Sequence, residues 1–154
     1  MGNSSLTRSA YMARALGEAR AAAARGEVPV GAVLVKDGEI LSSAGNRTLE
    51  LKDPSAHAEM LVIREAARLL GSERLVGCDL WVTLEPCAMC AAVISFARIR
   101  RLYYGASDPK MGGVEHGGRH YAQTTCHHVP EVYPGIAERE AGELLKTFFA
   151  GRRD

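Results

Sequence analysis

A strand, a helix and a second strand follow one another between residues 78 and 107, and this order restricts the fold more than any other feature of the sequence. The run CDLWVTLE is apolar almost throughout, which predicts a strand buried on both faces. The run PCAMCAAVISFARI predicts a helix, and RRLYYGAS predicts another strand. Because a helix joins the two strands, we expect them to lie parallel in one sheet, with a right-handed crossover.

The segments before this unit predict two helices and a hairpin. Residues 4–27 are rich in alanine and close at a glycine, so they predict a helix. Residues 28–45 hold an Asp-Gly pair between two apolar runs, which predicts a β-hairpin. Residues 53–71 predict a second helix, capped by Asp53 or Ser55. On the first helix, the side chains expected to face the core are Leu6, Met12, Ala15 and Leu16.

The chain after this unit begins irregularly and ends in a helix. Residues 111–130 are rich in glycine and histidine and show no periodicity, whereas residues 137–153 predict an amphipathic helix. The predicted elements together indicate the α/β class, as a three-layer α/β/α sandwich with a mixed central sheet. Since the sequence shows no internal repeat and no linker, we expect a single domain over residues 1–154.

Composition and charge exclude few classes of partner but favour a soluble protein. Hydrophobic residues make up 47% of the chain and charged residues 24%, as in ordinary globular domains. The net charge of +1 provides no large field for non-specific binding to nucleic acid or to a membrane, although it is compatible with recognition of one shaped RNA. The first residues hold no signal-peptide core and no transmembrane run, so we expect a cytoplasmic location.

The run TLEPCAMC places two of the four cysteines, Cys87 and Cys90, three positions apart at the predicted start of a helix. Four uses are open to this pair: a disulfide, a redox pair, half of a structural zinc site, or half of a catalytic one. A reducing cytoplasm disfavours the disulfide. Positions i and i+3 share a helix face, and the helix N-terminus favours the thiolate form that binds metal.

A histidine and a glutamate about thirty residues earlier favour the catalytic zinc site. His57 lies near the start of the preceding predicted helix, so it can supply a third ligand beside the two sulfurs. Three protein ligands leave one position for water, whose pKa zinc lowers to about 7. Glu59 can then carry protons, provided that the helix begins between or around the two residues, since i and i+2 otherwise point apart. Taken singly, His57 is more often a core or capping histidine and Glu59 a solvated acid of the first turn.

HAE followed by PCAMC is the H-x-E…P-C-x-x-C signature of zinc-dependent nucleoside and nucleobase deaminases. The runs EVPVGAVLV, GNR, DPSAHAEM and LWVTLEPCAMCAAVISFARIRRLYYGASDPK resemble the bacterial tRNA-specific adenosine deaminases over nearly the whole chain. The resemblance implies a cytidine-deaminase-like fold and one Zn²⁺ per chain, bound by His57, Cys87 and Cys90, with Glu59 as proton shuttle. It also implies a homodimer that edits adenosine to inosine at the wobble position of an arginine tRNA anticodon.

The same resemblance assigns substrate contacts, each with a plainer structural alternative. Asn46 matches a residue that contacts the flipped nucleoside, but asparagine is also common in turns. The residues with implied contacts are Val30 as a pocket wall, the backbone of Leu84 and Glu85, Asp108 beside the RNA backbone, Lys110 at a phosphate, and Phe148 and Phe149 near the anticodon loop. Core packing, a turn aspartate or a solvated lysine would explain these positions equally well, and one of the two phenylalanines is expected in the core.

Two other functions share much of this pattern. A deaminase of a free nucleobase, nucleoside or nucleotide, such as guanine or cytosine, would use the same zinc chemistry. A non-catalytic zinc-stabilised RNA-binding module would have no use for Glu59. The role of two further groups of side chains is not decided by the sequence. The apolar face of Ala91, Val93 and Phe96 fits either a dimer contact or the core. A second metal could be suggested by His116, His120, Cys126, His127 and His128, but their spacing fits no known metal site.

Overall fold

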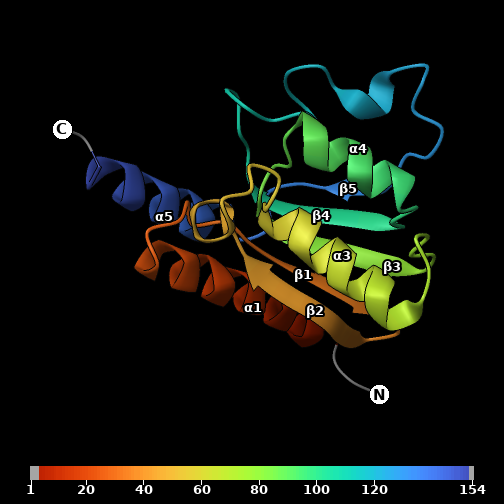
Figure 1. The fold of residues 1–154 in the computed structure, drawn as a ribbon, viewed down its shortest axis with the longest axis horizontal. Coiled ribbons are helices and arrows are strands. Elements are labelled where there is room, and N and C mark those ends of the chain that lie inside the picture. The colour runs from red at the N-terminus through yellow and green to blue at the C-terminus, as the bar shows by residue number, and fades with distance from the viewer. Residues whose placement is uncertain (1–3, 153–154) are drawn as a thin grey trace.

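The structure, a computed structural model that describes residues 4–152, is a sheet with helices on both faces (Figure 1). Helices α1 (Ser4–Ala24) and α5 (Glu138–Ala150) pack on one face, and α3 (Ala58–Leu70) and α4 (Ala88–Phe96) pack on the other. This arrangement confirms the predicted three-layer α/β/α sandwich. Within the described residues, no helix is long and apolar enough to span a membrane.

The central sheet is mixed, as predicted, and its strand order is β2-β1-β3-β4-β5. Its strands are β1 (Gly31–Lys36), β2 (Glu39–Gly45), β3 (Cys78–Leu84), β4 (Arg101–Ala106) and β5 (Glu131–Tyr133). The pair β1–β2 is the predicted hairpin, and β3 and β4 are parallel, joined through α4. Strand β5 was not predicted, because three residues are too few to show a period. It is defined by its parallel pairing with β4.

Alternate residues of the central strands build the two halves of the core. Leu34, Leu80 and Leu102 face α3 and α4. Val33 and Trp81, one position along, face α1 and α5. The apolar run of β3 is therefore buried on both faces, as its composition predicts.

Helix α1 approaches the hairpin closely where Ala15 lies against Gly31 of β1. Met12, Ala15 and Leu16 are buried as expected, whereas the side chain of Leu6 lies outside the described residues. A Cβ atom added to Gly31 would lie 1.9 Å from the backbone oxygen of Ala15. The glycine in β1 therefore sets the distance between α1 and the sheet.

Helix α3 begins later than the sequence predicts, and neither Asp53 nor Ser55 caps it. The Asp53 carboxylate instead accepts hydrogen bonds from the N–H and the hydroxyl of Ser55, at 2.9 and 2.7 Å, and closes a local turn. The residue before the helix is His57, and the N–H of Ala58 is bonded by the side chain of Asn46. The helix therefore starts between His57 and Glu59.

Two short helices were also not predicted, α2 (Thr48–Leu51) and η1 (His120–Ala122). The buried carboxylate of Glu27 accepts hydrogen bonds from the backbone N–H groups of Leu49 and Glu50, at 3.1 and 2.9 Å. Because the partner of α2 lies more than twenty residues earlier in the chain, its local sequence carries little helical signal.

Strands β2 and β3 run in the same direction because each is antiparallel to β1. Helix α3 follows β2 and helix α4 follows β3, so both helices start at the same end of the sheet. In open α/β sheets this end is where ligands bind.

Candidate metal centre and active site

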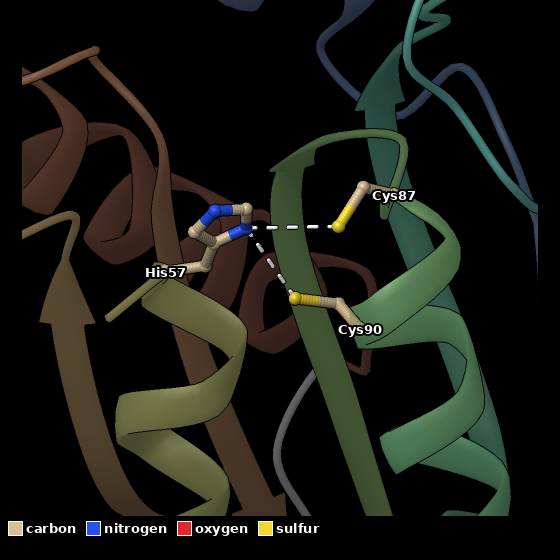
Figure 2. Close-up of side chains that lie close together, drawn as sticks. All are labelled: His57, Cys87 and Cys90. Atoms are coloured by element: carbon tan, nitrogen blue, oxygen red, sulfur yellow. Dashed lines mark hydrogen bonds between the residues drawn. The ribbon is translucent and has the colours of Figure 1, made fainter. Parts of the chain in front are cut away.

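Three metal-binding side chains meet where α3 and α4 begin. His57 is the residue before α3, Cys87 is the residue before α4, and Cys90 lies in the first turn of α4. The Nδ1 atom of His57 lies 3.7 Å from Sγ of Cys87 and 3.6 Å from Sγ of Cys90. Figure 2 shows the ring nitrogen and both sulfurs directed toward one another.

The spacing and chemistry of these donors fit zinc. Ligand atoms about 2.0 to 2.3 Å from a tetrahedral zinc ion lie roughly 3.3 to 3.8 Å from one another, which matches both measured separations. One imidazole and two thiolates also suit zinc better than harder ions. Among the described residues, no further histidine, cysteine or acid joins the group, so the site offers three protein ligands. A fourth position is then open to water or substrate, as a catalytic zinc site requires.

The cysteine pair favours one thiolate even before any metal binds. A hydrogen bond from the Cys90 thiol lowers the pKa of Cys87 to about 4; burial opposes this shift and the contact with His57 supports it. The same bond raises the pKa of Cys90, and so does its burial. The Cys87 sulfur is therefore an anion at neutral pH. Cys87 and Cys90 do not form a disulfide, and neither do the other two cysteines.

Glu59 is buried beside the three ligands, with 3% of its surface exposed. Burial raises the pKa of Glu59 to about 7, so its carboxyl can both take up and release a proton near neutral pH. Because α3 begins at Ala58, the helical constraint that turns i and i+2 apart does not apply to His57 and Glu59. Both side chains line the same cavity.

The cavity has a volume of about 600 Å³, within the range of small-ligand pockets. It brings together seven of the eight residues to which the resemblance assigns substrate contacts: Val30, Asn46, Leu84, Glu85, Asp108, Lys110 and Phe149. The other lining residues were not predicted from the sequence; they are Val28, Thr48, Ser107, Met111 and Leu145. These residues lie at the ends of predicted elements, between them or within the last helix, and nothing in the local sequence indicates that they face a cavity.

Phe148 is the eighth residue, and it does not reach the cavity. Its ring borders a groove between α1 and α5, and the guanidinium carbon of Arg152 lies 4.3 Å from the ring centroid. Phe149, the next residue, lines the cavity and is 53% exposed. The two rings contact each other edge to face, with their centroids 5.4 Å apart, but only Phe149 lines the cavity. Neither ring belongs to the core, so the expectation that one of them is a core residue was wrong.

The polar cavity residues are largely committed to the protein itself. The N–H of Glu85 donates to the carbonyl of Ala106 at 2.8 Å, so this N–H is not one of the backbone groups of Leu84 and Glu85 that are left to contact a base. The Oδ1 atom of Asp108 accepts from the N–H groups of Lys110 and Met111, at 3.2 and 3.0 Å, so Asp108 also closes a turn. Burial would raise the pKa of the Glu85 carboxyl, but hydrogen bonds from Asp108 and from the segment around residue 115 hold it below its ordinary value.

The histidine-rich segment does not form a second metal site in the described part of the chain. His116 Nδ1 lies 2.7 Å from the Glu85 carboxylate, and His128 Nε2 lies 2.7 Å from the carbonyl of Ile99. Cys126 contacts the hydroxyl of Ser95 at 3.4 Å. These side chains have separate structural partners.

An α/β/α sandwich in which one histidine and two cysteines can hold a metal ion, with a buried glutamate beside them, is the arrangement of the zinc-dependent deaminases. The model of the cytidine and deoxycytidylate deaminase zinc-binding region matches residues 6–106. A tRNA-specific adenosine deaminase of Agrobacterium fabrum is 62% identical over 146 residues, which cover 95% of this chain and 96% of the relative. A solved structure from studies of A-to-I editing by tRNA:A34 deaminases at the wobble position of transfer RNA is 64% identical, with a TM-score of 0.87, and the match covers 88% of this chain and 98% of that one.

The chain therefore belongs to the zinc-binding cytidine and deoxycytidylate deaminase family, in its branch of tRNA-specific adenosine deaminases. A guanine deaminase from Nitrosomonas europaea shares the fold, with a TM-score of 0.79 at 22% identity, over 92% of this chain and 84% of that one.

Proposed function

We propose that this protein deaminates the wobble adenosine of a tRNA anticodon to inosine, with an arginine tRNA as its substrate. The observation that carries the proposal is the buried Glu59 beside the group of His57, Cys87 and Cys90. Glu59 lines a cavity of about 600 Å³, a volume that accommodates a small ligand such as a nucleoside. The identity of 62% to a relative named tRNA-specific adenosine deaminase supports this substrate over a free base.

His57, Cys87 and Cys90 would hold one Zn²⁺ per chain, which when bound supplies the acidity that activates a water molecule for attack on carbon 6 of adenine. Glu59 accepts one proton from the attacking water and delivers it to a ring nitrogen. It then takes the second proton from the oxygen added at carbon 6 and delivers it to the amino group, which leaves as ammonia when its bond to carbon 6 breaks. Its pKa of about 7 suits both transfers. The net reaction consumes adenosine and water and releases inosine and ammonia.

The cavity walls would bind a nucleotide splayed out of the anticodon loop. Because Oδ1 of Asn46 is bonded to Ala58, the NH₂ group is the part of this side chain left to contact the nucleoside. Val30 provides an apolar wall, Phe149 offers an exposed ring for stacking at the rim, and Lys110 is placed for a phosphate.

A homodimer in the cytoplasm is part of the proposal. Of the apolar residues on α4, Ala91 lies in the core and Val93 packs against it, whereas Phe96 is 75% exposed and remains available to a partner subunit. Four free cysteines suit a reducing compartment. Sedimentation of the protein and of Phe96→Ser tests the dimer: a monomeric wild-type protein contradicts it.

The experiment that tests the proposed substrate compares inosine formation on an anticodon stem-loop with turnover of free guanine, cytosine and adenosine by the same protein. Inosine on the stem-loop, with little turnover of the free compounds, is the expected result. Efficient turnover of a free base with an inert stem-loop would replace the RNA substrate with a small molecule.

A further inference from the structure

The side chain of Glu85 is a buried acceptor for five N–H groups of a single loop. Glu85 is 2% exposed, at the end of β3. Its Oε1 accepts from the N–H of Asp108 at 3.0 Å and contacts His116 Nδ1 at 2.7 Å. Its Oε2 accepts from the N–H groups of Val114, Glu115 and His116, at 3.2, 2.9 and 3.2 Å. A carboxylate only accepts, so the ring nitrogen of His116 carries the proton of their bond.

The loop that Glu85 holds, residues 107–116, joins the substrate cavity to the metal centre. Its first half lines the cavity through Asp108, Lys110 and Met111. Its middle lies against the turn that bears a metal ligand: Gly112 pairs with Cys87 in an isolated antiparallel bridge. By holding this loop, the Glu85 carboxylate can fix the position of both the cavity wall and the turn that bears Cys87.

Two glycines allow this close approach. A Cβ atom on Gly112 would lie 2.5 Å from the carboxyl carbon of Glu85, and one on Gly113 would lie 2.6 Å from the backbone nitrogen of Ala88. The N–H of Gly113 also donates to the carbonyl of Pro86 at 2.8 Å. The backbone of the loop is thus laid directly on the start of α4.

The far end of the loop is anchored at two adjacent residues. His116 bonds to Glu85, and the preceding residue, Glu115, accepts a hydrogen bond from the hydroxyl of the buried Tyr104. Both anchors are buried in the interior: Glu85 directly follows β3, and Tyr104 lies in β4. The loop has no regular secondary structure of its own, so these side chains set its position.

We propose that Glu85 is a positioning residue for the deamination, and that its carboxylate, with His116 as its side-chain partner, fixes the 107–116 loop as the wall of the substrate cavity. This inference rests on the proposed function. The role differs from a backbone contact with the base, because the N–H of Glu85 is already bonded to Ala106. A wall that binds the nucleotide equally in the ground state and the transition state affects KM more than kcat.

The test uses Glu85→Gln, which keeps the side-chain size but turns an N–H₂ group toward backbone donors. We expect KM for the anticodon stem-loop to rise about tenfold and kcat to change by less than about threefold. Zinc content should stay at one per chain. Amide hydrogen exchange should rise in residues 107–116, a change that a purely catalytic role would not produce. Asp79→Asn is the matched control: it removes the ion pair with Arg100 at the other end of β3 and should leave KM unchanged.

If Glu85→Gln does not fold, His116 provides the second test. His116→Ala should raise KM and loop exchange in the same direction, by about threefold. His116→Gln, which keeps an N–H donor, should restore part of both. Wild-type KM and wild-type loop exchange in these variants would overturn the proposal, as would loss of zinc in proportion to activity. A wild-type protein inert on the stem-loop would contradict the proposed function instead, and the exchange rates would still decide whether Glu85 anchors the loop.

Discussion

The side-chain Oδ1 of Asn46 accepts a hydrogen bond of 2.8 Å from the backbone N–H of Ala58. This bond joins the end of the β1–β2 hairpin to the first turn of α3. Because Ala58 lies between His57 and Glu59, this bond fixes the backbone where the helix starts. The two side chains on either side of Ala58 both line the cavity.

Asn46→Ala should destabilise the protein by about 1 to 2 kcal/mol, because the N–H of Ala58 loses its partner in a buried position. Urea denaturation measures the change. Asn46→Asp keeps an acceptor at the helix N-terminus and should retain most of the stability. Equal stability of Asn46→Ala and the wild-type protein would show that the bond does not define the start of α3.

Gly31→Ala should destabilise the protein by about 2 to 4 kcal/mol, because the added methyl group would overlap the backbone of α1 at Ala15. Gly17→Ala is the matched control, since Gly17 lies on the exposed side of α1 with nothing within 4 Å of the added atom. That change should stabilise the helix by about 0.5 to 1 kcal/mol. In thermal unfolding, the melting temperature should fall for Gly31→Ala and rise for Gly17→Ala; a rise or no change for Gly31→Ala would contradict the close packing of α1 on β1.

Glu27→Gln tests the hydrogen bonds that cap α2. Burial would raise the pKa of Glu27, but the bonds from Glu50 and Leu49 outweigh it and lower the pKa below its ordinary value. A lowered folded-state pKa means stability that is complete above the unfolded pKa and is lost as pH falls through the folded one. We therefore expect the variant to be less stable by about 1 to 3 kcal/mol near neutral pH, and the difference to shrink below about pH 4.5. A difference that is constant with pH would contradict this origin.

Cys87→Ala should lose the zinc that the wild-type protein carries and with it the deaminase activity, because two remaining ligands hold zinc poorly. Elemental analysis of the purified protein measures the metal directly. Cys126→Ser is the control, since Cys126 is also a free, half-buried cysteine but lies with Ser95 away from the metal centre. Zinc retained in the Cys87 variant would place the metal elsewhere.

The parts of the fold that the sequence predicts are those with a local period or a local turn signal. The apolar runs of β3 and β4 and the Asp-Gly turn at residues 37 and 38 are of this kind. The start of α3 was predicted at Asp53 or Ser55, and this was wrong, because a capping residue with a suitable side chain can close its own turn instead. The true partner of the helix start, Asn46, is twelve residues away.

In the candidate site, too, the features with a local sequence signal were predicted and the contacts between distant residues were not. The H-x-E and C-x-x-C spacings indicate a metal centre because each pair sits within one helix start, and topology places the two starts together. The side-chain role of Glu85 is not visible in the sequence, because its donors lie 23 to 31 residues later in a loop without periodicity. Contacts between distant irregular segments leave no pattern in the local sequence.

The role of Glu59 in deamination is tested most simply by inosine formation on an anticodon stem-loop by Glu59→Gln, with zinc content and RNA affinity determined on the same protein. The amide keeps the size of the buried side chain but cannot carry a proton between water, ring nitrogen and leaving amine. We predict full zinc content, nearly unchanged RNA affinity and a loss of about 10²-fold or more in kcat. Inosine formation at the wild-type rate would contradict the role of Glu59 and the catalytic interpretation of the metal centre.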